Sequence, residues 1–145
     1  EVVSLSELGQ RRQVGHRVRD LLVNLFPRSR LAVPEPLGGW DRDISTSEEL
    51  LQYAVAFDTM LGAGYDFGAD EAVIVERLAS LATELYDNFA NPSTASGFAV
   101  LHWNNHRSKT GAALVAAAIA LAEYTAQPGS DPRGVRDPAA WLDYG

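Results

Sequence analysis

Apolar residues recur at steps of three and four along most of this chain, which is the spacing of one helix face. The pattern predicts helices over about 4–26, 47–61, 70–90 and 106–125, and no segment shows the alternation of a strand. Loops rich in proline, glycine and serine separate these helices. The sequence therefore predicts an all-α protein, built from helical hairpins in two layers. The first three apolar stripes are Val14, Val18, Leu21, Leu22 and Leu25; Leu50, Leu51, Ala54, Phe57, Met60 and Leu61; and Ile74, Leu78, Leu81, Leu85 and Phe89.

Several helix starts carry their own signals. A capping box pairs a serine or threonine with a glutamate three residues later. Ser4 with Glu7, Ser45 with Glu48 and Thr46 with Glu49 fit this pattern. Asp137–Pro138 suits the start of a further helix, since Asp is a good N-cap and Pro is favoured in the first turn. Because the chain stops soon after that start, we expect residues 1–145 to be the N-terminal part of a longer helical domain.

The fourth stretch, 111–122, is apolar on every side. A helix of this kind is normally buried all round, which a small four-helix domain rarely achieves. The stretch is too short to span a bilayer, so we expect no membrane partner. It predicts a central helix between two helical layers, and contact with the remainder of the polypeptide.

Charge is spread unevenly over the 145 residues, which carry a net charge of −7. Residues 1–42 hold seven arginines, whereas 43–105 hold ten acids and a single arginine. An acidic domain argues against nucleic acid as a partner. The chain has no cysteine, so disulfides and cysteine-ligated zinc are excluded.

A metal site is not predicted. His102 and His106 have the spacing of two ligands on one helix face, but no third ligand lies nearby. Residues 41–52 superficially suggest a calcium loop, yet Thr46 and Gln52 stand where glycine and a bidentate glutamate are required. We expect no metal and no cofactor.

Asn104, Asn105 and His106 precede the apolar helix and form the most specific signal in the chain. One interpretation is structural, because asparagine is a preferred N-cap. The other is functional, because free N–H groups at a helix start favour an anion. The positive helix end would also lower the pKa of the His106 imidazole and keep it neutral, as a base beside a bound carboxylate requires. Both interpretations remain open.

The Asn104-Asn105-His106 segment, followed by a helix of small residues, resembles toroidal alginate lyases and their heparinase II/III-type relatives. The resemblance covers about twenty residues. It implies that the chain is part of an α/α toroid and that its protein cleaves uronic-acid polysaccharides by β-elimination. It also implies a secreted or periplasmic location, with Asn105 neutralising the substrate carboxylate, His106 acting as the base, and a tyrosine acting as acid or base.

On this hypothesis the ligand is an acidic polysaccharide or another anionic molecule. Trp40 and Trp103 would stack on sugar rings, Asn104 would contact the substrate, and Arg107 would add positive charge at the carboxylate. The alternative is a non-catalytic helical module that binds a partner or serves as a scaffold. In that case Asn104 and Asn105 are caps, and the tryptophans pack loops onto the helices.

Overall fold

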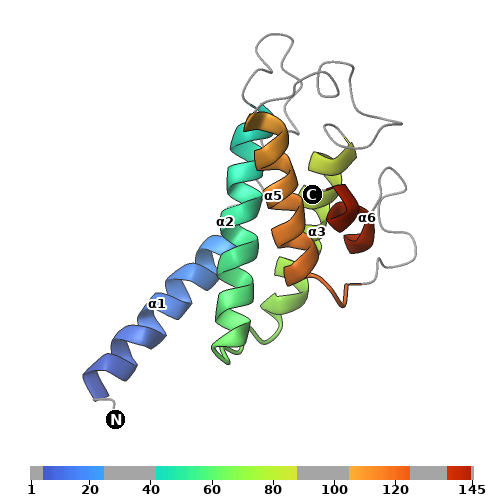
Figure 1. The fold of residues 1–145 in the computed structure, drawn as a ribbon. Coiled ribbons are helices and arrows are strands. Elements are labelled where there is room, and N and C mark those ends of the chain that lie inside the picture. The colour runs from blue at the N-terminus through green and yellow to red at the C-terminus, as the bar shows by residue number, and fades with distance from the viewer. Residues whose placement is uncertain (1–4, 25–41, 88–104, 125–136, 145) are drawn as a thin grey trace.

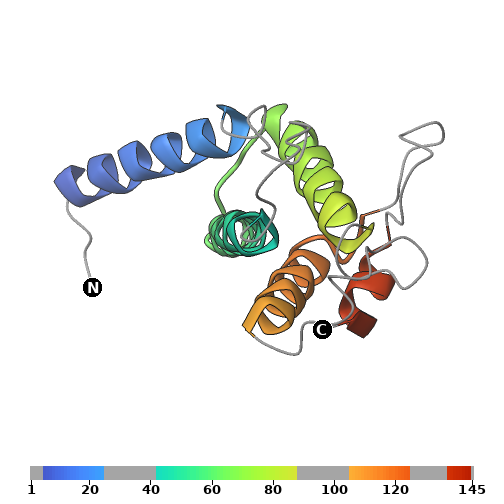
Figure 2. The same cartoon turned by 90° about the horizontal axis from the view of Figure 1, so that it is seen from above.

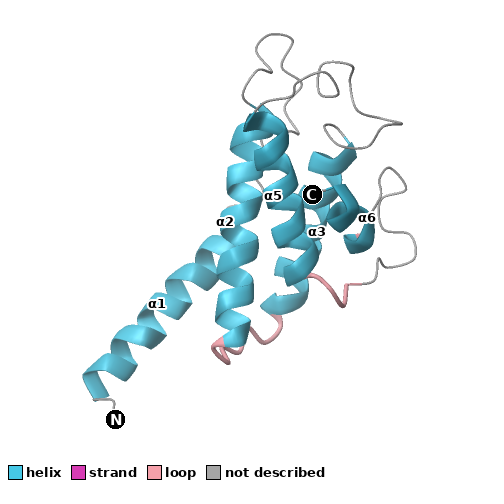
Figure 3. Cartoon of the chain, viewed as in Figure 1, coloured by secondary structure: helices cyan, strands magenta, loops and turns pink. Residues whose placement is uncertain are grey.

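The computed structural model describes residues 5–24, 42–87, 105–124 and 137–144. Every regular element in these ranges is a helix and none is a strand, which confirms the predicted all-α class for this part of the chain (Figures 1 and 3). The elements are α1 (Leu5–Asn24), α2 (Arg42–Gly62), α3 (Asp70–Leu85), α5 (Asn105–Ala120) and α6 (Pro138–Tyr144).

The helices pack in two layers, as Figure 2 shows from above. Helices α2, α5 and α6 lie beside one another in one layer, and α1 and α3 lie against it in the other. The predicted layered packing is therefore confirmed for the described residues. An apolar core joins the layers and includes Leu22, Leu50, Ala54, Phe57, Ile74, Leu78, Leu85, Leu114, Leu121 and Trp141.

Helices α2 and α5 form the most extensive helix pair and run in the same direction (Figure 1). Near the start of both helices, the buried hydroxyls of Ser47 and Thr110 lie 3.3 Å apart. Their neighbours in the sequence, Lys109 and Glu48, form an ion pair between the same two helices. Each buried hydroxyl gains a polar partner in the other helix, which offsets the cost of removing it from water.

Helix α3 returns antiparallel to α2 after a short connection. The connection includes Gly64 and Gly68, whose φ angles of 75° and 58° suit glycine far better than other residues. The Asp66 carboxylate accepts a hydrogen bond of 2.8 Å from the Gly68 N–H and so braces the turn before α3. This α2–α3 pair is a helical hairpin of the kind that the sequence predicts.

Helix α3 begins at Asp70, as predicted, and its expected stripe of Ile74, Leu78, Leu81 and Leu85 is buried. The predicted cap of α6 is also confirmed, because the Asp137 side chain accepts a hydrogen bond from the Ala139 N–H at 2.9 Å.

The predicted start of α2 was wrong. The helix begins at Arg42, so Ser45 and Thr46 lie inside it and do not serve as N-caps. Thr46 and Ser47 are buried instead. Capping boxes do not mark this start because the helix already begins before them, at Arg42. Ser47 has its polar partner, Thr110, in another helix, and such a partner is not visible in the local sequence.

The predicted all-round burial of the apolar helix was also wrong. Helix α5 buries Ala113, Leu114 and Ala117 along one face, whereas Ile119 on another face is 60% exposed. Alanine costs little when it faces water, so an alanine-rich helix can lie at the side of a bundle. Because α5 is not enclosed on all sides, it gives no support to the toroid implied by the family resemblance.

The first stripe is only partly buried. Leu22 is in the core and Val18 packs against it, but Val14 and Leu21 are 60% and 50% exposed. Helix α1 joins the bundle through its second half and projects beyond it (Figure 1).

Candidate functional site

The first turn of α5 lies at the end of the bundle where α2 begins. Asn105 is the first residue of α5 and His106 the second, so the backbone places both where the sequence predicts a helix start. Their side-chain positions are outside what the structure describes. Trp40, Trp103 and Asn104 also lie outside the described residues, so the predicted aromatic contacts to sugar rings stay predictions.

Arg107 is the member of the predicted site whose side chain the structure places. It is exposed, and its guanidinium carbon lies 5.8 Å from the centre of the Tyr144 ring. This distance is within the range of a cation–π contact, which orients the guanidinium without consuming its positive charge. Tyr144 in turn meets Tyr86 edge-on, with ring centres 6.5 Å apart.

These contacts bring four helix ends together. Arg107 is in the first turn of α5, Tyr86 follows the last residue of α3, and Tyr144 is the last residue of α6. The Ser47–Thr110 pair places the start of α2 beside them. We call Arg107, Tyr86 and Tyr144, together with the first turn of α5, the α5-start cluster.

The electrostatics of the cluster favour an anion. A helix start carries partial positive charge, which acidic side chains in the first turn normally complement. Helix α3 has Asp70 and Glu71 there, but the first turn of α5 has no acidic residue and instead contains Arg107. The first turn of α5 therefore combines the positive end of a helix with a guanidinium, a combination suited to a carboxylate.

Tyr86 and Tyr144 were not among the residues predicted for the site. They come from different helices and are far apart in the chain, and neither lies in a motif. Only the packing of α6 against α5 brings Tyr144 to Arg107. A local sequence signal for this contact does not exist.

Other charged and polar side chains link the helices through an ion pair and a hydrogen bond. Lys109 is held by Glu48, and the Tyr124 hydroxyl donates a hydrogen bond of 3.2 Å to Glu76 of α3. No group of three histidine, aspartate or glutamate side chains that could hold a metal occurs among the described residues.

Comparison with known proteins finds no relative. No protein-family model matches the chain, and neither the curated proteins nor the solved structures contain a match. Within the described ranges, no helix has the length and apolar character needed to cross a membrane.

Proposed function

We propose that the α5-start cluster binds the carboxylate of a uronic-acid glycan and that the protein cleaves this glycan by β-elimination. The observation that carries the proposal is the contact of Arg107 with Tyr144 at a helix start without acidic residues. It adds a guanidinium and a phenol to the asparagine and histidine of the first turn. The asparagine, the histidine and a tyrosine are the groups that the family resemblance implies, and the guanidinium would add positive charge at the carboxylate.

Each step of the reaction has a candidate group. Asn105 and Arg107 would neutralise the substrate carboxylate, which makes the hydrogen on the adjacent carbon more acidic. Neutral His106 would remove that proton as a general base. The glycosidic C–O bond on the next carbon would then break with formation of a C=C bond. Tyr144 is the candidate for donating a proton to the departing oxygen.

The test is the ultraviolet absorbance of the unsaturated uronate product. Purified protein is mixed with alginate, heparan sulfate, hyaluronate and polygalacturonate in turn, and we expect absorbance to rise with one of them. His106→Ala should lower the rate at least about 100-fold, the usual contribution of general base catalysis. His16→Ala is the matched control, since His16 lies on α1 beside Tyr65 and away from the cluster.

The proposal also expects Tyr144→Phe to slow cleavage while substrate binding is preserved, because the ring that contacts Arg107 is retained. Equal cleavage rates for the wild type and the His106→Ala variant would remove His106 from the mechanism. No product with any uronate polysaccharide would refute the lyase proposal itself.

A non-catalytic binding or scaffold module is the second candidate. It is favoured by the large apolar side chains on the surface of the described helices, among them Val14, Leu21 and Ile119. Val14 and Leu21 lie on one face of α1, and neighbouring exposed apolar groups of this kind often mark sites of protein association. Binding of a uronate glycan without absorbance of unsaturated product would favour this second candidate.

A further inference from the structure

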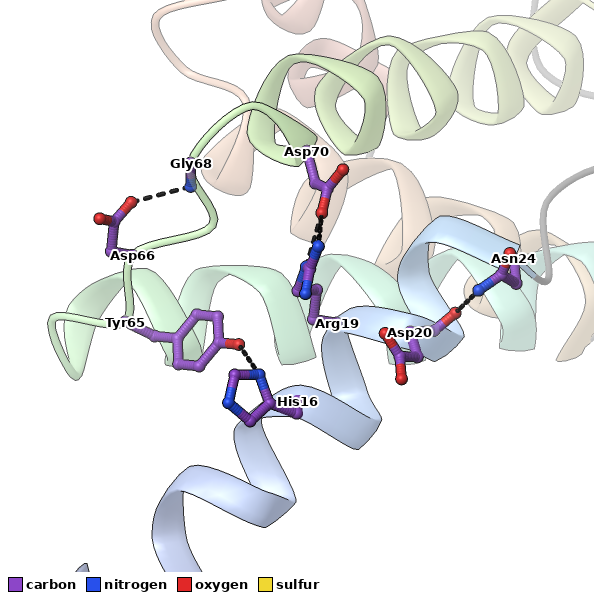
Figure 4. A network of polar contacts seen from close by, with 8 residues as sticks. All are labelled: His16, Arg19, Asp20, Asn24, Tyr65, Asp66, Gly68 and Asp70. Carbon is purple, nitrogen blue, oxygen red and sulfur yellow. Dashed lines mark hydrogen bonds and ion pairs between the residues drawn. The ribbon is translucent and has the colours of Figure 1, made fainter.

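Helix α1 is fastened to the bundle at a few points in its second half. The Tyr65 ring packs on Gly15, and its hydroxyl lies 3.2 Å from Nδ1 of His16. Arg19 forms an ion pair with Asp70, and Figure 4 shows both contacts from close by. Figures 1 and 2 show that the first half of α1 extends away from the other described helices.

The projecting helix presents a face that is both apolar and basic. Val14 and Leu21 are exposed and two turns apart, a separation of roughly 10 Å along the axis. Arg17, also exposed, lies between them at helical spacing. Helix α1 as a whole holds four arginines and two acids, although the chain is acidic. We call Val14, Arg17 and Leu21 the α1 face.

A groove with the complementary character lies where α2 and α5 end and α3 begins. It has a volume of about 410 Å³, and no residue of α1 lines it. Phe57, Val75 and Leu121 provide apolar walls, and Ile119 stands 60% exposed at its side. Its polar members include two exposed carboxylates and a tyrosine: Glu71, Glu123 and Tyr124.

We propose that this groove accepts the α1 face of a second copy of the chain. Val14 and Leu21 would cover the apolar walls, as the anchors of an amphipathic helix do in a groove. Arg17 would lie beside Glu71 and Glu123, which gives the contact matching charge. The α2–α3 part of the chain is acidic and α1 is basic, so the two surfaces attract each other at long range.

The α1 face and the groove are different surfaces of the same chain, so the contact is heterologous. Each copy can offer its α1 face to one neighbour and its groove to another. Such a contact produces rings or open chains of copies, and a simple twofold dimer is not expected. The proposal does not depend on the glycan site, since the α5-start cluster is at the other end of α5.

The test uses two variants that each lack one surface. Val14→Asp/Leu21→Asp removes the α1 face, and Glu71→Lys/Glu123→Lys reverses the charge of the groove. Average mass is measured by sedimentation equilibrium from about 1 µM to about 1 mM, a range that covers weak protein interfaces. The wild type should exceed the monomer mass of 15.7 kDa increasingly with concentration, and each variant alone should remain a monomer.

A mixture of the two variants gives the decisive result. Val14→Asp/Leu21→Asp, the α1-face variant, keeps an intact groove, and Glu71→Lys/Glu123→Lys, the groove variant, keeps an intact α1 face. The lysines of the groove variant repel arginine, so only the groove of the α1-face variant can accept a partner. That groove accepts the intact α1 face of the groove variant, and the expected product is a 1:1 complex of twice the monomer mass that grows no further.

Leu142→Asp is the control, because Leu142 is exposed and belongs to neither surface. It should associate like the wild type. Circular dichroism checks that each variant is helical, and Arg17→Glu is a milder second α1-face variant that should also weaken association. A wild type that stays at the monomer mass throughout the range overturns the proposal. So does a mixture that shows no 1:1 complex while the wild type associates.

Discussion

Gly15 is the position where a single methyl group has the clearest structural consequence. An alanine Cβ there would lie 2.5 Å from Cε2 and 2.9 Å from Cδ2 of Tyr65, well inside van der Waals contact. The ring is not free to withdraw without loss, since its centre lies 4.9 Å from that of Phe67 and its hydroxyl contacts His16. Gly15→Ala should therefore loosen the attachment of α1 to the bundle.

The size of the effect follows from three contributions. Alanine in place of glycine within a helix stabilises it by about 1 kcal/mol. Overpacking costs about 1–3 kcal/mol, and loss of the Tyr65–His16 hydrogen bond costs about 1 kcal/mol more. The clash outweighs the gain in helix propensity, and we expect a net loss of about 1–3 kcal/mol in the docking of α1.

Hydrogen exchange measured by mass spectrometry on peptides from α1 is the suitable assay, because α1 can detach while the rest of the bundle stays folded. Each 1.4 kcal/mol of lost stability should speed exchange about tenfold in the second half of α1. Gly9→Ala is the matched control, since a Cβ at Gly9 meets nothing within 4 Å. It should slow exchange slightly.

A third variant isolates the clash. In a Tyr65→Ala background the ring is absent, so Gly15→Ala should behave like Gly9→Ala. The reasoning is refuted if, with Tyr65 present, Gly15→Ala protects α1 as well as Gly9→Ala does.

Three further predictions concern the bundle. Trp141→Ala should cost about 3–5 kcal/mol in urea unfolding, because Trp141 is fully buried, whereas Leu142→Ala at an exposed neighbour should change stability by less than about 0.5 kcal/mol; similar losses would contradict the docking of α6. Thr110→Val should cost about 1 kcal/mol by removing the buried hydroxyl contact between α2 and α5, and no loss would contradict that contact. Burial raises the pKa of the Tyr53 hydroxyl above its usual 10.0, so the folded protein favours the neutral hydroxyl more than the unfolded chain does. This contribution to the free energy of unfolding is complete below about pH 10 and is lost as pH rises through the folded-state pKa. Tyr53→Phe should therefore flatten the alkaline fall in the free energy of unfolding, and an unchanged pH profile would contradict this assignment.

The parts of the fold that sequence predicted well depend on local chemistry. Asp70 begins α3 because its carboxylate suits a helix start, and the buried stripe from Ile74 to Leu85 keeps the helical steps of three and four residues. Asp137 caps α6 by accepting a hydrogen bond from the N–H of Ala139, two residues further along the chain. These contacts are made within a few residues, so the sequence contains everything needed to infer them.

The parts that sequence missed depend on residues far apart. Ser47 is polar, yet it is buried because Thr110 of another helix provides its partner. Val14 and Leu21 fit a core stripe, yet they are exposed because the bundle covers the face of α1 that carries Val18 and Leu22. Periodicity shows that a helix has an apolar face, but it does not show what the face meets.

The candidate site was predictable to a similar extent. Asn105, His106 and Arg107 were found from the sequence because they adjoin a helix start, and the structure confirms that position along the backbone. Tyr144 was not found from the sequence, because its contact with Arg107 depends on how α6 packs against α5. The roles of these residues in catalysis stay predictions.

The parallel pairing of α2 with α5 also affects how the protein folds. Ser47 and Thr110 are 63 residues apart, so the largest helix contact cannot form until a long stretch of chain has been closed. During synthesis at about 5–20 residues per second, α2 waits about 3–13 s for the partner residues of α5 to be made. Over that time the apolar face of α2, with Leu50, Ala54 and Phe57, is covered only in part by α3. The nascent chain should therefore be most prone to aggregation, and most dependent on chaperones, in the interval before α5 emerges from the ribosome.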